Sequence, residues 1–399
     1  MLTTLHSLPL RRTATFAIAM AIGLASCGSD STDTTDDSSA DTGATPEATA
    51  PPETTGSDLA VVAGAPFPAE RCAANEAAGT VTFLTGFDFA AAASIVEVIV
   101  ADAAGYYDDL CLDVEIRPGF SAQNYPLLAS GSAQFASGGS FSEVVNFANA
   151  NDASFIAASV AGRTAIDTLI VKAGVATELA DLAGTTIGVK GKLPTSIEVM
   201  LLEAGLVEGD DFDTVLLEGF DPLAHIAQPI DALPGWKSNE VGALERAGVG
   251  ISLFDPLEAG VPGSFGVIFT TAEFASEHPT AATDFMRATA RGLADAVTDP
   301  AAAAATAVDL INAGGNPNFL SPDGETFRWE TEAELILAGT PEGVGFGTPD
   351  LAVLQAELDA YAPTGVFGDD VSTLDASTYV ASSVIDGVYD DDAVVIWPG

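Results

Sequence analysis

Positive charge is scarce in this chain of 399 residues, which has 13 Lys and Arg against 57 Asp and Glu and a formal net charge of −44. Binding to a phosphate backbone or to an anionic membrane surface requires clustered Lys and Arg, so this balance argues against both partners. The deficit does not indicate disorder, because 48% of the residues are hydrophobic and the mean hydropathy is +0.31. The length fits one large or two medium domains.

Catalytic signatures are also absent. The sequence contains no G-x-S-x-G, H-E-x-x-H, P-loop or C-x-x-C motif. Asp-Asp pairs follow from the acidic composition, and solvated surface is their default role. Only His225 and His278 follow the first 26 residues, and two isolated histidines are more often structural than metal ligands. We therefore expect a protein that is not an enzyme and that has no metal or cofactor.

Long hydrophobic runs are missing beyond the N-terminus, where residues 1–26 have the form of an export signal. Arg11 and Arg12 precede an apolar run at 13–24 that is too short to span a bilayer. The run ends in Leu-Ala-Ser before Cys27, which resembles the lipobox of bacterial lipoproteins, whose cysteine is acylated and becomes the mature N-terminus. The alternative is an ordinary secretory signal with an incidental cysteine.

Residues 27–58 read as a tether, because they are rich in Ser, Thr, Asp, Pro, Glu, Gly and Ala and contain eight acids and no base. Such a segment cannot bury a core, and its like charges extend it. The folded body then begins near residue 59 and holds 49 acids and 11 bases. Its two cysteines are Cys72, before the first predicted strand, and Cys111, at the start of the second. Export and adjacent parallel strands would allow a disulfide, and two free buried thiols are the alternative.

Strands and helices alternate along the body, which predicts parallel sheets covered by helices on both faces. A first unit has strands at 81–85, 111–117, 133–136 and 155–160, with helices at 91–104, 122–129 and 141–150, the last capped by Ser140. A second unit has strands at 168–171, 186–189, 215–217, 230–233 and 249–253. It also has a helical turn at 179–184 and a helix whose start is marked by a capping box of Thr195 and Glu198. A returning strand at 265–270 precedes helices at 281–297, 301–311, 331–337, 350–361 and 376–385.

This order predicts an α/β protein of two lobes, with the chain passing between them near 164–172 and again near 257–267. The second lobe, 166–265, is inserted in the first, which comprises 59–165 and 266–399. Ligands of open α/β sheets bind beyond the carboxyl ends of the strands, and two facing lobes place those ends in one cleft.

Four ordered motifs now resemble a known family: AGYY at 104–107 with LDV at 112–114, LASG at 128–131 with QF at 134–135, DLAGTTIGV at 181–189, and DA at 231–232 followed by GW and SNE up to residue 240. They are similar to solute-binding lipoproteins of ABC importers, in the branch that binds thiamine pyrimidine precursors, riboflavin, alkanesulfonates and nitrate. The resemblance covers roughly residues 81–388.

The resemblance implies a type II periplasmic-binding-protein-like fold and a monomer that is anchored outside the cytoplasm and hands a small solute to an ABC permease and its ATPase. It implies no cofactor. The alternative within the family is an enzyme that makes the thiamine pyrimidine from its own histidine with iron. That enzyme carries a cysteine-rich motif, and this chain has no cysteine cluster.

Candidate ligand-binding residues lie where predicted strands end. Phe87, Asp88 and Phe89 follow the first strand, where an aromatic ring stacks on a flat ligand or packs the lobes together. Asn124, Gly139 and Ser140 follow the next strands, and Thr195 starts the corresponding helix of the second lobe. These positions offer hydroxyls and helix N–H groups to a ligand, and ordinary capping explains them equally well.

Trp236, Asn239 and Glu240 form the preferred site. A buried carboxylate suits the N–H donors of an amino-pyrimidine or an imide, and an indole ring suits an aromatic ligand. The alternative is that Asn239 and Glu240 merely cap a helix that continues through Arg246.

The charge of the ligand depends on four bases in or near the predicted cleft: Arg163, Lys190, Lys192 and Lys237. A sulfonate or nitrate would need such cations, and a neutral heterocycle would not. The aromatic residues and Glu240 favour a flat, neutral or weakly polar heterocycle, such as a thiamine pyrimidine precursor or a riboflavin-like compound. An anion of the sulfonate or nitrate type is the alternative ligand.

Overall fold

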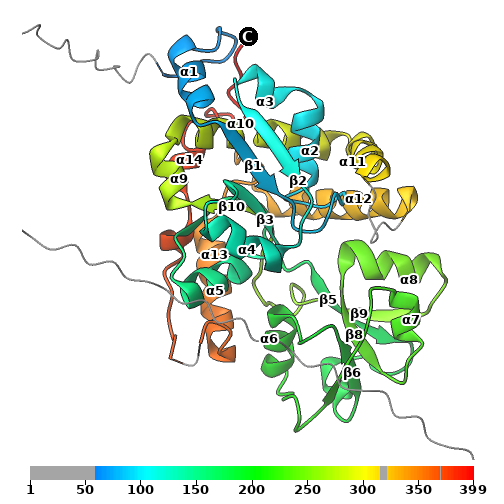
Figure 1. Ribbon diagram of the computed structural model, residues 1–399. Coiled ribbons are helices and arrows are strands. Elements are labelled where there is room, and N and C mark those ends of the chain that lie inside the picture. The colour runs from blue at the N-terminus through cyan, green and yellow to red at the C-terminus, as the bar shows by residue number, and fades with distance from the viewer. Residues whose placement is uncertain (1–58, 315–320, 369) are drawn as a thin grey trace, which may run out of the picture. The chain divides into compact units, whose positions relative to one another are not determined.

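The computed structural model describes residues 59–314, 321–368 and 370–399 (Figure 1). They belong to a compact unit that spans Thr54–Gly399. The predicted export signal at 1–26, the acylated Cys27 and the tether at 27–58 lie outside the described residues. No helix in the described part of the chain is long and apolar enough to cross a membrane.

Two five-stranded sheets organise the fold (Figure 1). The first has the order β2-β1-β3-β10-β4 and the second the order β7-β6-β8-β5-β9. The strands of the first sheet are β1 (Thr80–Leu84), β2 (Asp113–Arg117), β3 (Phe135–Gly138), β4 (Phe155–Gly162) and β10 (Phe265–Thr271). Those of the second are β5 (Asp167–Lys172), β6 (Thr186–Val189), β7 (Asp213–Leu216), β8 (Ala232–Trp236) and β9 (Ile251–Phe254).

The chain leaves the first sheet after β4 and returns to it at β10, so the second sheet is inserted in the first. This confirms the predicted α/β class with an inserted second half, whereas the exact lobe bounds stay a prediction. The predicted parallel pairing holds for β1 with β2 and β3 and for β6 with β7 and β8, but not for the two strands at which the chain passes between the sheets. β10 runs antiparallel to both its neighbours, and so does β5. Each follows a passage from the other sheet, so no helical crossover within its own sheet makes it parallel.

Helices pack against both sheets. Those before β5 and after β10 are α1 (Ala69–Ala77), α2 (Val96–Ala103), α3 (Tyr106–Asp109), α4 (Ser121–Ala129), α5 (Phe141–Asn151), α9 (Ala272–Glu277), α10 (Pro279–Thr298), α11 (Pro300–Gly314), α12 (Pro322–Gly339), α13 (Leu351–Tyr361), η3 (Ala362–Thr364), η4 (Ala376–Tyr379) and α14 (Ser382–Ile385). Those between β5 and β9 are η1 (Leu179–Leu182), α6 (Thr195–Glu203), α7 (Pro222–Ile226), the π-helical turn η2 (Lys237–Val241) and α8 (Gly242–Arg246).

The helix starts predicted from the local sequence are correct in one case and wrong in others. Ser140 caps α5 as predicted, and Glu143 completes a capping box. The capping box predicted at the start of α6 is wrong: Pro194 occupies the cap position, and no side chain caps the helix. The helix predicted over 91–104 begins only at α2, because the preceding N–H groups donate to carboxylates elsewhere in the fold. The helix predicted over 376–385 is two short ones, η4 and α14.

Aromatic side chains hold α10 against the first sheet. Phe83 of β1, Phe135 of β3 and Phe285 of α10 are fully buried, and the rings of Phe135 and Phe285 stack with centroids 4.1 Å apart. Burial of each such ring contributes about 1.5–3 kcal/mol to folding. This packing fixes the position of the residue before Phe285, which is Asp284.

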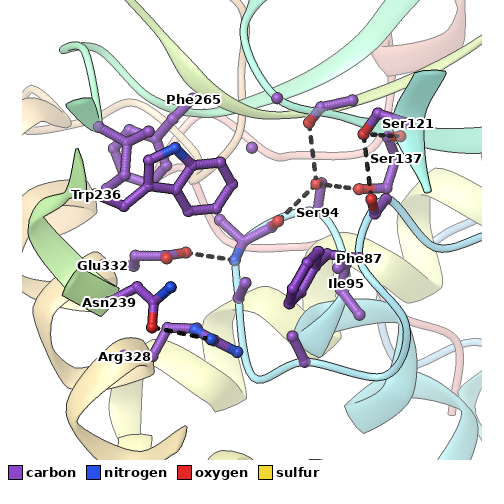
Figure 2. Close-up of a pocket in the computed structure, with 18 of the residues that line it drawn as sticks. Phe87, Ser94, Ile95, Ser121, Ser137, Trp236, Asn239, Phe265, Arg328 and Glu332 are labelled. Atoms are coloured by element: carbon purple, nitrogen blue, oxygen red, sulfur yellow. Dashed lines mark hydrogen bonds between the residues drawn. The ribbon is translucent and has the colours of Figure 1, made fainter. Parts of the chain in front are cut away.

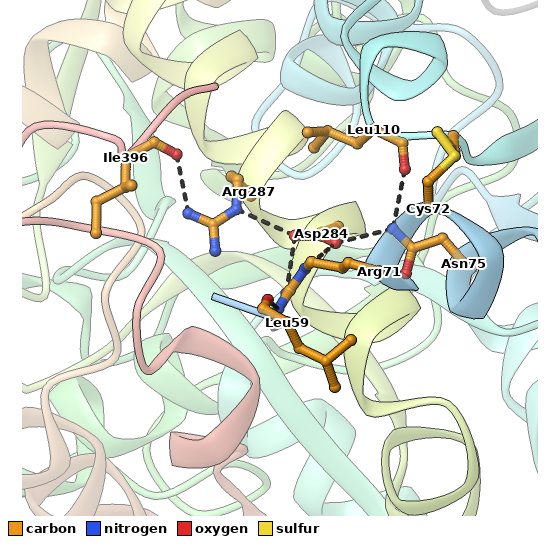
Figure 3. A network of polar contacts seen from close by, with 9 residues as sticks. Leu59, Arg71, Cys72, Asn75, Leu110, Asp284, Arg287 and Ile396 are labelled. Carbon is orange, nitrogen blue, oxygen red and sulfur yellow. Dashed lines mark hydrogen bonds and ion pairs between the residues drawn. A yellow bond between two sulfur atoms is a disulfide. The ribbon is translucent and has the colours of Figure 1, made fainter. Parts of the chain in front are cut away.

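Asp284 is the centre of a buried polar network that joins three segments (Figure 3). It accepts hydrogen bonds from Arg71 at 2.6 and 3.0 Å, from Asn75 at 2.8 Å and from Arg287 at 3.1 Å. The same guanidinium of Arg71 donates to the carbonyl of Leu59, the first described residue. One carboxylate thus anchors the start of the folded body to α1 and α10.

A disulfide between Cys72 and Cys111 lies beside this network (Figure 3). Their Cα atoms are 5.2 Å apart. Cys72 is in α1 and Cys111 lies two residues before β2, which pairs in parallel with β1. The two cysteines are therefore as close as the sequence predicted.

Replacing Asp284 should be strongly destabilising. Asp284→Asn leaves the buried guanidinium groups of Arg71 and Arg287 without their shared countercharge, which typically costs about 3–5 kcal/mol. Urea unfolding of the variant would measure this loss. Asp309→Asn, on the exposed face of α11, is the matched control and should change the free energy of unfolding by less than about 0.5 kcal/mol. Equal stability of the two variants would contradict this account of the network.

Candidate functional site

Two neighbouring pockets form one cleft beside the ends of both sheets. The first compartment has a volume of about 250 Å³ and the second about 650 Å³. They share four lining residues, Ser121, Gly139, Ile166 and Trp236. Trp236, at the end of β8, is therefore the large aromatic residue that faces both.

The first compartment has aromatic walls. Phe87, Phe220, Trp236 and Phe265 line it together with small apolar side chains. In Figure 2, Trp236, Asn239, Arg328 and Glu332 lie on one side, and Phe87, Ser94, Ser121 and Ser137 lie on the other. A concave, mostly apolar pocket with a few convergent polar groups is typical of a small-molecule site.

One wall is a loop that we call the pocket loop, residues 87–95. Two of its N–H groups donate to buried carboxylates of one distant helix, α12: Ala91 to Glu325 at 3.0 Å and Ala93 to Glu332 at 2.6 Å. Ser94 has a φ of 64° and donates its N–H to Glu97 at 2.8 Å. These bonds replace the helical pattern that the alanine-rich sequence predicts, so the loop forms turns beside the pocket instead of a helix.

Glu332 of α12 also binds the second half of the chain. The hydroxyl of Ser238, in η2, donates to its other oxygen at 2.7 Å. Both residues are almost fully buried, and burial raises the pKa of Glu332 above its usual range. A single side chain thus connects the pocket loop, α12 and η2.

The two cations that line the first compartment are both neutralised. Lys190 pairs with Glu240 at 2.5 Å, and Glu240 also accepts the N–H of Trp236 at 2.9 Å. Arg328 pairs with Glu325 at 2.7 Å, and its guanidinium lies 5.8 Å from the centroid of the Phe87 ring. An anionic ligand would find no unpaired cation among the described residues of this compartment.

The second compartment is more polar. Asp167 of β5 and Glu143 of α5 line it with Lys192, Thr195 and Ser196 at the start of α6. Burial raises the pKa of Asp167 to about 7, with the charge of Glu143 adding to the effect. The hydroxyl of Ser196 donates to Asp167 at 3.2 Å.

The N-terminus of α5 does not offer free N–H groups to a ligand, as the sequence suggested it would. The N–H of Phe141 donates to Ser264 at 2.8 Å, that of Ser142 to Glu357 at 3.0 Å and that of Glu143 to Ser140 at 3.3 Å. The protein itself satisfies these donors, so capping is the role that the structure gives to Ser140.

Most of the predicted binding residues lie on the cleft, and their roles stay predictions. Phe87, Gly139, Trp236, Asn239 and Glu240 line the first compartment. The second is lined by Ser140, Lys192 and Thr195, besides Gly139 and Trp236. Asn239 and Glu240 belong to η2 rather than to the cap of a regular helix, and Glu240 binds Lys190.

Four predicted residues line neither compartment: Asp88, Phe89, Asn124 and Arg163. Phe89 packs in the apolar cluster under the pocket loop. Asn124 donates to the carbonyl of Thr85 at 2.8 Å, and Arg163 pairs with Asp350 at 3.1 Å. The backbone N–H of Asp88 donates to the carbonyl of Gly119 at 2.9 Å.

Sequence reasoning missed Ser94, Arg328 and Glu332. Ser94 was assigned to a helix. Arg328 lies in the N-terminal half of α12, which the apolar pattern did not reveal because α12 buries charged side chains as well as Trp329. Glu332 lies in the helix expected at 331–337, but nothing in the pattern marked it as a site residue. Ser321 followed by Pro322 was an available helix-start signal, since Ser321 caps α12 and Pro322 takes its first position.

Neither of the two described histidines lies on this cleft. His225 and His278 line neither compartment. His225 is buried with its Nε2 2.9 Å from the carbonyl oxygen of Glu218. Within the described ranges, no cluster of three or more His, Cys, Asp or Glu has the arrangement of a metal site.

A family model described as NMT1/THI5 like matches residues 92–303. The chain belongs to this family. The matched segment runs from the pocket loop to the start of α11, so it contains both sheets except β1. The resemblance noted from the motifs is thereby confirmed. No curated protein sequence matches the chain.

Solved structures with the same fold include the alkanesulfonate-binding protein SsuA of Xanthomonas axonopodis pv. citri bound to MOPS. It is 16% identical with a TM-score of 0.53, over 75% of this chain and 97% of that one. A putative periplasmic sulfonate-binding SsuA of Methylobacillus flagellatus KT is 15% identical with a TM-score of 0.57, over 77% and 92%. The desulfurization enzyme DSZB is 13% identical with a TM-score of 0.53, over 77% and 98%. These likenesses confirm the periplasmic-binding-protein-like fold, which carries both binding proteins and an enzyme.

Glu97, which accepts the N–H of Ser94 in the pocket loop, should make the stability of the protein depend on pH. Its carboxyl ionises near pH 4.5 when unfolded, whereas burial raises its pKa to about 8 in the fold. Stability from this group is therefore present below pH 4.5 and is lost as the pH rises toward 8. The Glu97→Gln variant has no carboxyl to ionise at this position, so it does not lose this stability. As the pH rises, its free energy of unfolding should increase relative to that of the wild type by up to about 1.4 kcal/mol per pH unit. Urea unfolding at pH 5, 6, 7 and 8 checks this, and parallel pH profiles would disprove it.

Proposed function

We propose that this protein is the lipid-anchored solute-binding component of an ABC importer, and that it captures a small, flat, neutral heterocycle between two lobes. Membership in the NMT1/THI5-like family and the fold shared with periplasmic binding proteins support the transport role. Function is then affinity together with a hinge motion between the lobes, with no covalent chemistry.

The single observation that carries the choice of ligand is the first compartment itself. Four aromatic side chains line it, and its two cations are consumed by carboxylates of the protein. Aromatic walls gain by stacking on a flat ring, whereas a desolvated anion needs an unpaired cation. A thiamine pyrimidine precursor or a riboflavin-like ring has this chemistry.

The remaining features of the proposal come from the N-terminal sequence and from the family. Residues 1–26 would direct export, and acylated Cys27 would hold the protein on the outer side of the cell membrane. The tether at 27–58 would let a monomer reach the permease and ATPase. An enzymatic role on the same fold is less well supported, because Cys72 and Cys111 are bonded to each other and neither described histidine lines the cleft.

A second candidate ligand is an anion of the sulfonate or nitrate type. Its support is the start of α6, where no side chain caps the helix and where Lys192 and Thr195 line the second compartment. Uncapped helix N-termini attract anions. Asp167 and Glu143 in the same compartment oppose this ligand.

Ligand binding should depend on Trp236. Isothermal titration of the full-length protein against a thiamine pyrimidine precursor, riboflavin, taurine and nitrate should show binding to a heterocycle. Trp236→Ala should weaken that binding by about tenfold or more, because the ring loses its stacking partner. Trp397→Phe, which alters a tryptophan outside both compartments, is the control. Release of a chemically altered ligand would contradict a transport role, and binding of taurine or nitrate alone would favour the second candidate.

Glu240→Gln should change the ligand preference of the first compartment. The variant keeps an acceptor for the N–H of Trp236 but removes the countercharge of Lys190. An anion such as nitrate should then bind about tenfold more tightly than to the wild type, while the heterocycle loses affinity. The double variant Glu240→Gln with Lys190→Gln should lose the gain for the anion. An unchanged preference would remove this ion pair from the specificity of the site.

A further inference from the structure

The larger second compartment is not explained by a ring bound in the first. The two are continuous at Trp236, and the second is lined by α5, by the start of α6 and by Tyr361 of α13. A ligand ring against Trp236 therefore has room for a substituent that extends into about 650 Å³ of further space. The side chains there indicate which substituent that is.

Two carboxylates face this space without an ion pair. Asp167 accepts one hydrogen bond, from the hydroxyl of Ser196 at 3.2 Å, and Glu143 accepts the N–H of Ser140 at 3.4 Å. Neither forms an ion pair with a described residue, and Lys192 is the one described cation lining the compartment. Lys192 and Glu143 are both exposed, so water also solvates their charges, whereas Asp167 is only partly exposed.

The other charged groups around Asp167 do not neutralise it. Lys237 of η2 is bound to Asp255 at 2.7 Å, and Glu240 of the same turn is bound to Lys190. On the side of α13, Tyr361 donates its hydroxyl to the carbonyl of Pro262 at 3.0 Å. The protein thus leaves a partly buried carboxylate in the cleft without a bound cation, which favours a ligand that brings a positive charge.

An independent observation also indicates a polar ligand group. Tyr125 lines the second compartment and is 7% exposed, and its buried hydroxyl has no hydrogen-bond partner in the described protein. That hydroxyl lies beside Gly138, at the border with the first compartment. Buried hydroxyls in native proteins are nearly always bonded, so this hydroxyl is available to a polar atom that enters the compartment.

We propose that the ligand is a heterocycle that carries an alkylammonium group, with its ring against Trp236 and its ammonium bound by Asp167 and Glu143 in the second compartment. This assignment rests on the proposed function, because it needs the ring site in the first compartment. It keeps the neutral ring of that ligand in the first compartment and adds a charged substituent in the second. Charge-assisted hydrogen bonds from an ammonium to two carboxylates are among the strongest that proteins make.

The assignment has a pH signature. Burial raises the pKa of Asp167 to about 7. At pH 7 the Asp167 carboxyl is therefore protonated in about half of the ligand-free molecules. An ammonium binds the ionised form, and its binding therefore expels that proton. Affinity for an ammonium ligand should rise between pH 6 and pH 8, whereas affinity for an anion should fall.

Three pyrimidines with the same two- to four-carbon side chain, ending in an amine, a hydroxyl or a sulfonate, would test the proposal by titration calorimetry on the full-length protein. The amine should bind about tenfold more tightly than the alcohol at pH 8, and this advantage should shrink at pH 6. Asp167→Asn should abolish the advantage and the pH dependence. Glu143→Gln should reduce the advantage, and the exposed-site variant Asp309→Asn should keep both.

The outcomes separate this inference from the function on which it rests. If amine and alcohol bind equally and Asp167→Asn changes neither, the ring site stands and the ammonium site is wrong. If the sulfonate binds best and loses affinity in Lys192→Gln, the second compartment is an anion site and the proposal is overturned. If none of the three binds, both the ammonium site and the heterocycle-binding function fail.

Discussion

The cleft depends on two hydrogen bonds to the buried carboxylate of Glu332. It accepts the N–H of Ala93 at 2.6 Å and the hydroxyl of Ser238 at 2.7 Å, so one buried group holds the pocket loop and η2 at the same helix. A buried carboxylate without such donors would be strongly unfavourable. The pocket loop, the π-helical turn and α12 therefore share a constraint that none of them could satisfy alone.

Several of the scarce positive charges are likewise held by buried or partly buried carboxylates. Arg71 and Arg287 share Asp284, Lys190 binds Glu240, and Lys237 binds Asp255. In a protein with a net charge of −44, bases near the cleft looked like candidates for an anionic ligand. Carboxylate partners instead make Arg163, Lys190 and Lys237 internal supports. The pairing of Lys190 helps to explain how so acidic a chain leaves a neutral first compartment.

The fold by itself does not decide between binding and catalysis, since binding proteins and a desulfurization enzyme share it. The decision rests with side chains on the cleft. Here they are aromatic rings, paired charges and two carboxylates without a cation, a set that suits recognition of a ring with a basic substituent. Trp236 stands at the junction of both compartments and links the two parts of such a ligand.

Local sequence determined the alternation of strands and helices, the capping box of Ser140 and the proximity of Cys72 to Cys111, because each depends on residues close in the chain or on neighbouring strands. The sequence also predicted that Trp236, Asn239 and Glu240 lie at the cleft, because they follow a strand and the ends of parallel strands gather at one edge of a sheet. Only the tertiary structure decided the path of the pocket loop, the antiparallel crossing strands and the roles of Arg328 and Glu332. Those features depend on hydrogen bonds between residues about 90 to 240 positions apart, and no local pattern encodes a partner at that distance.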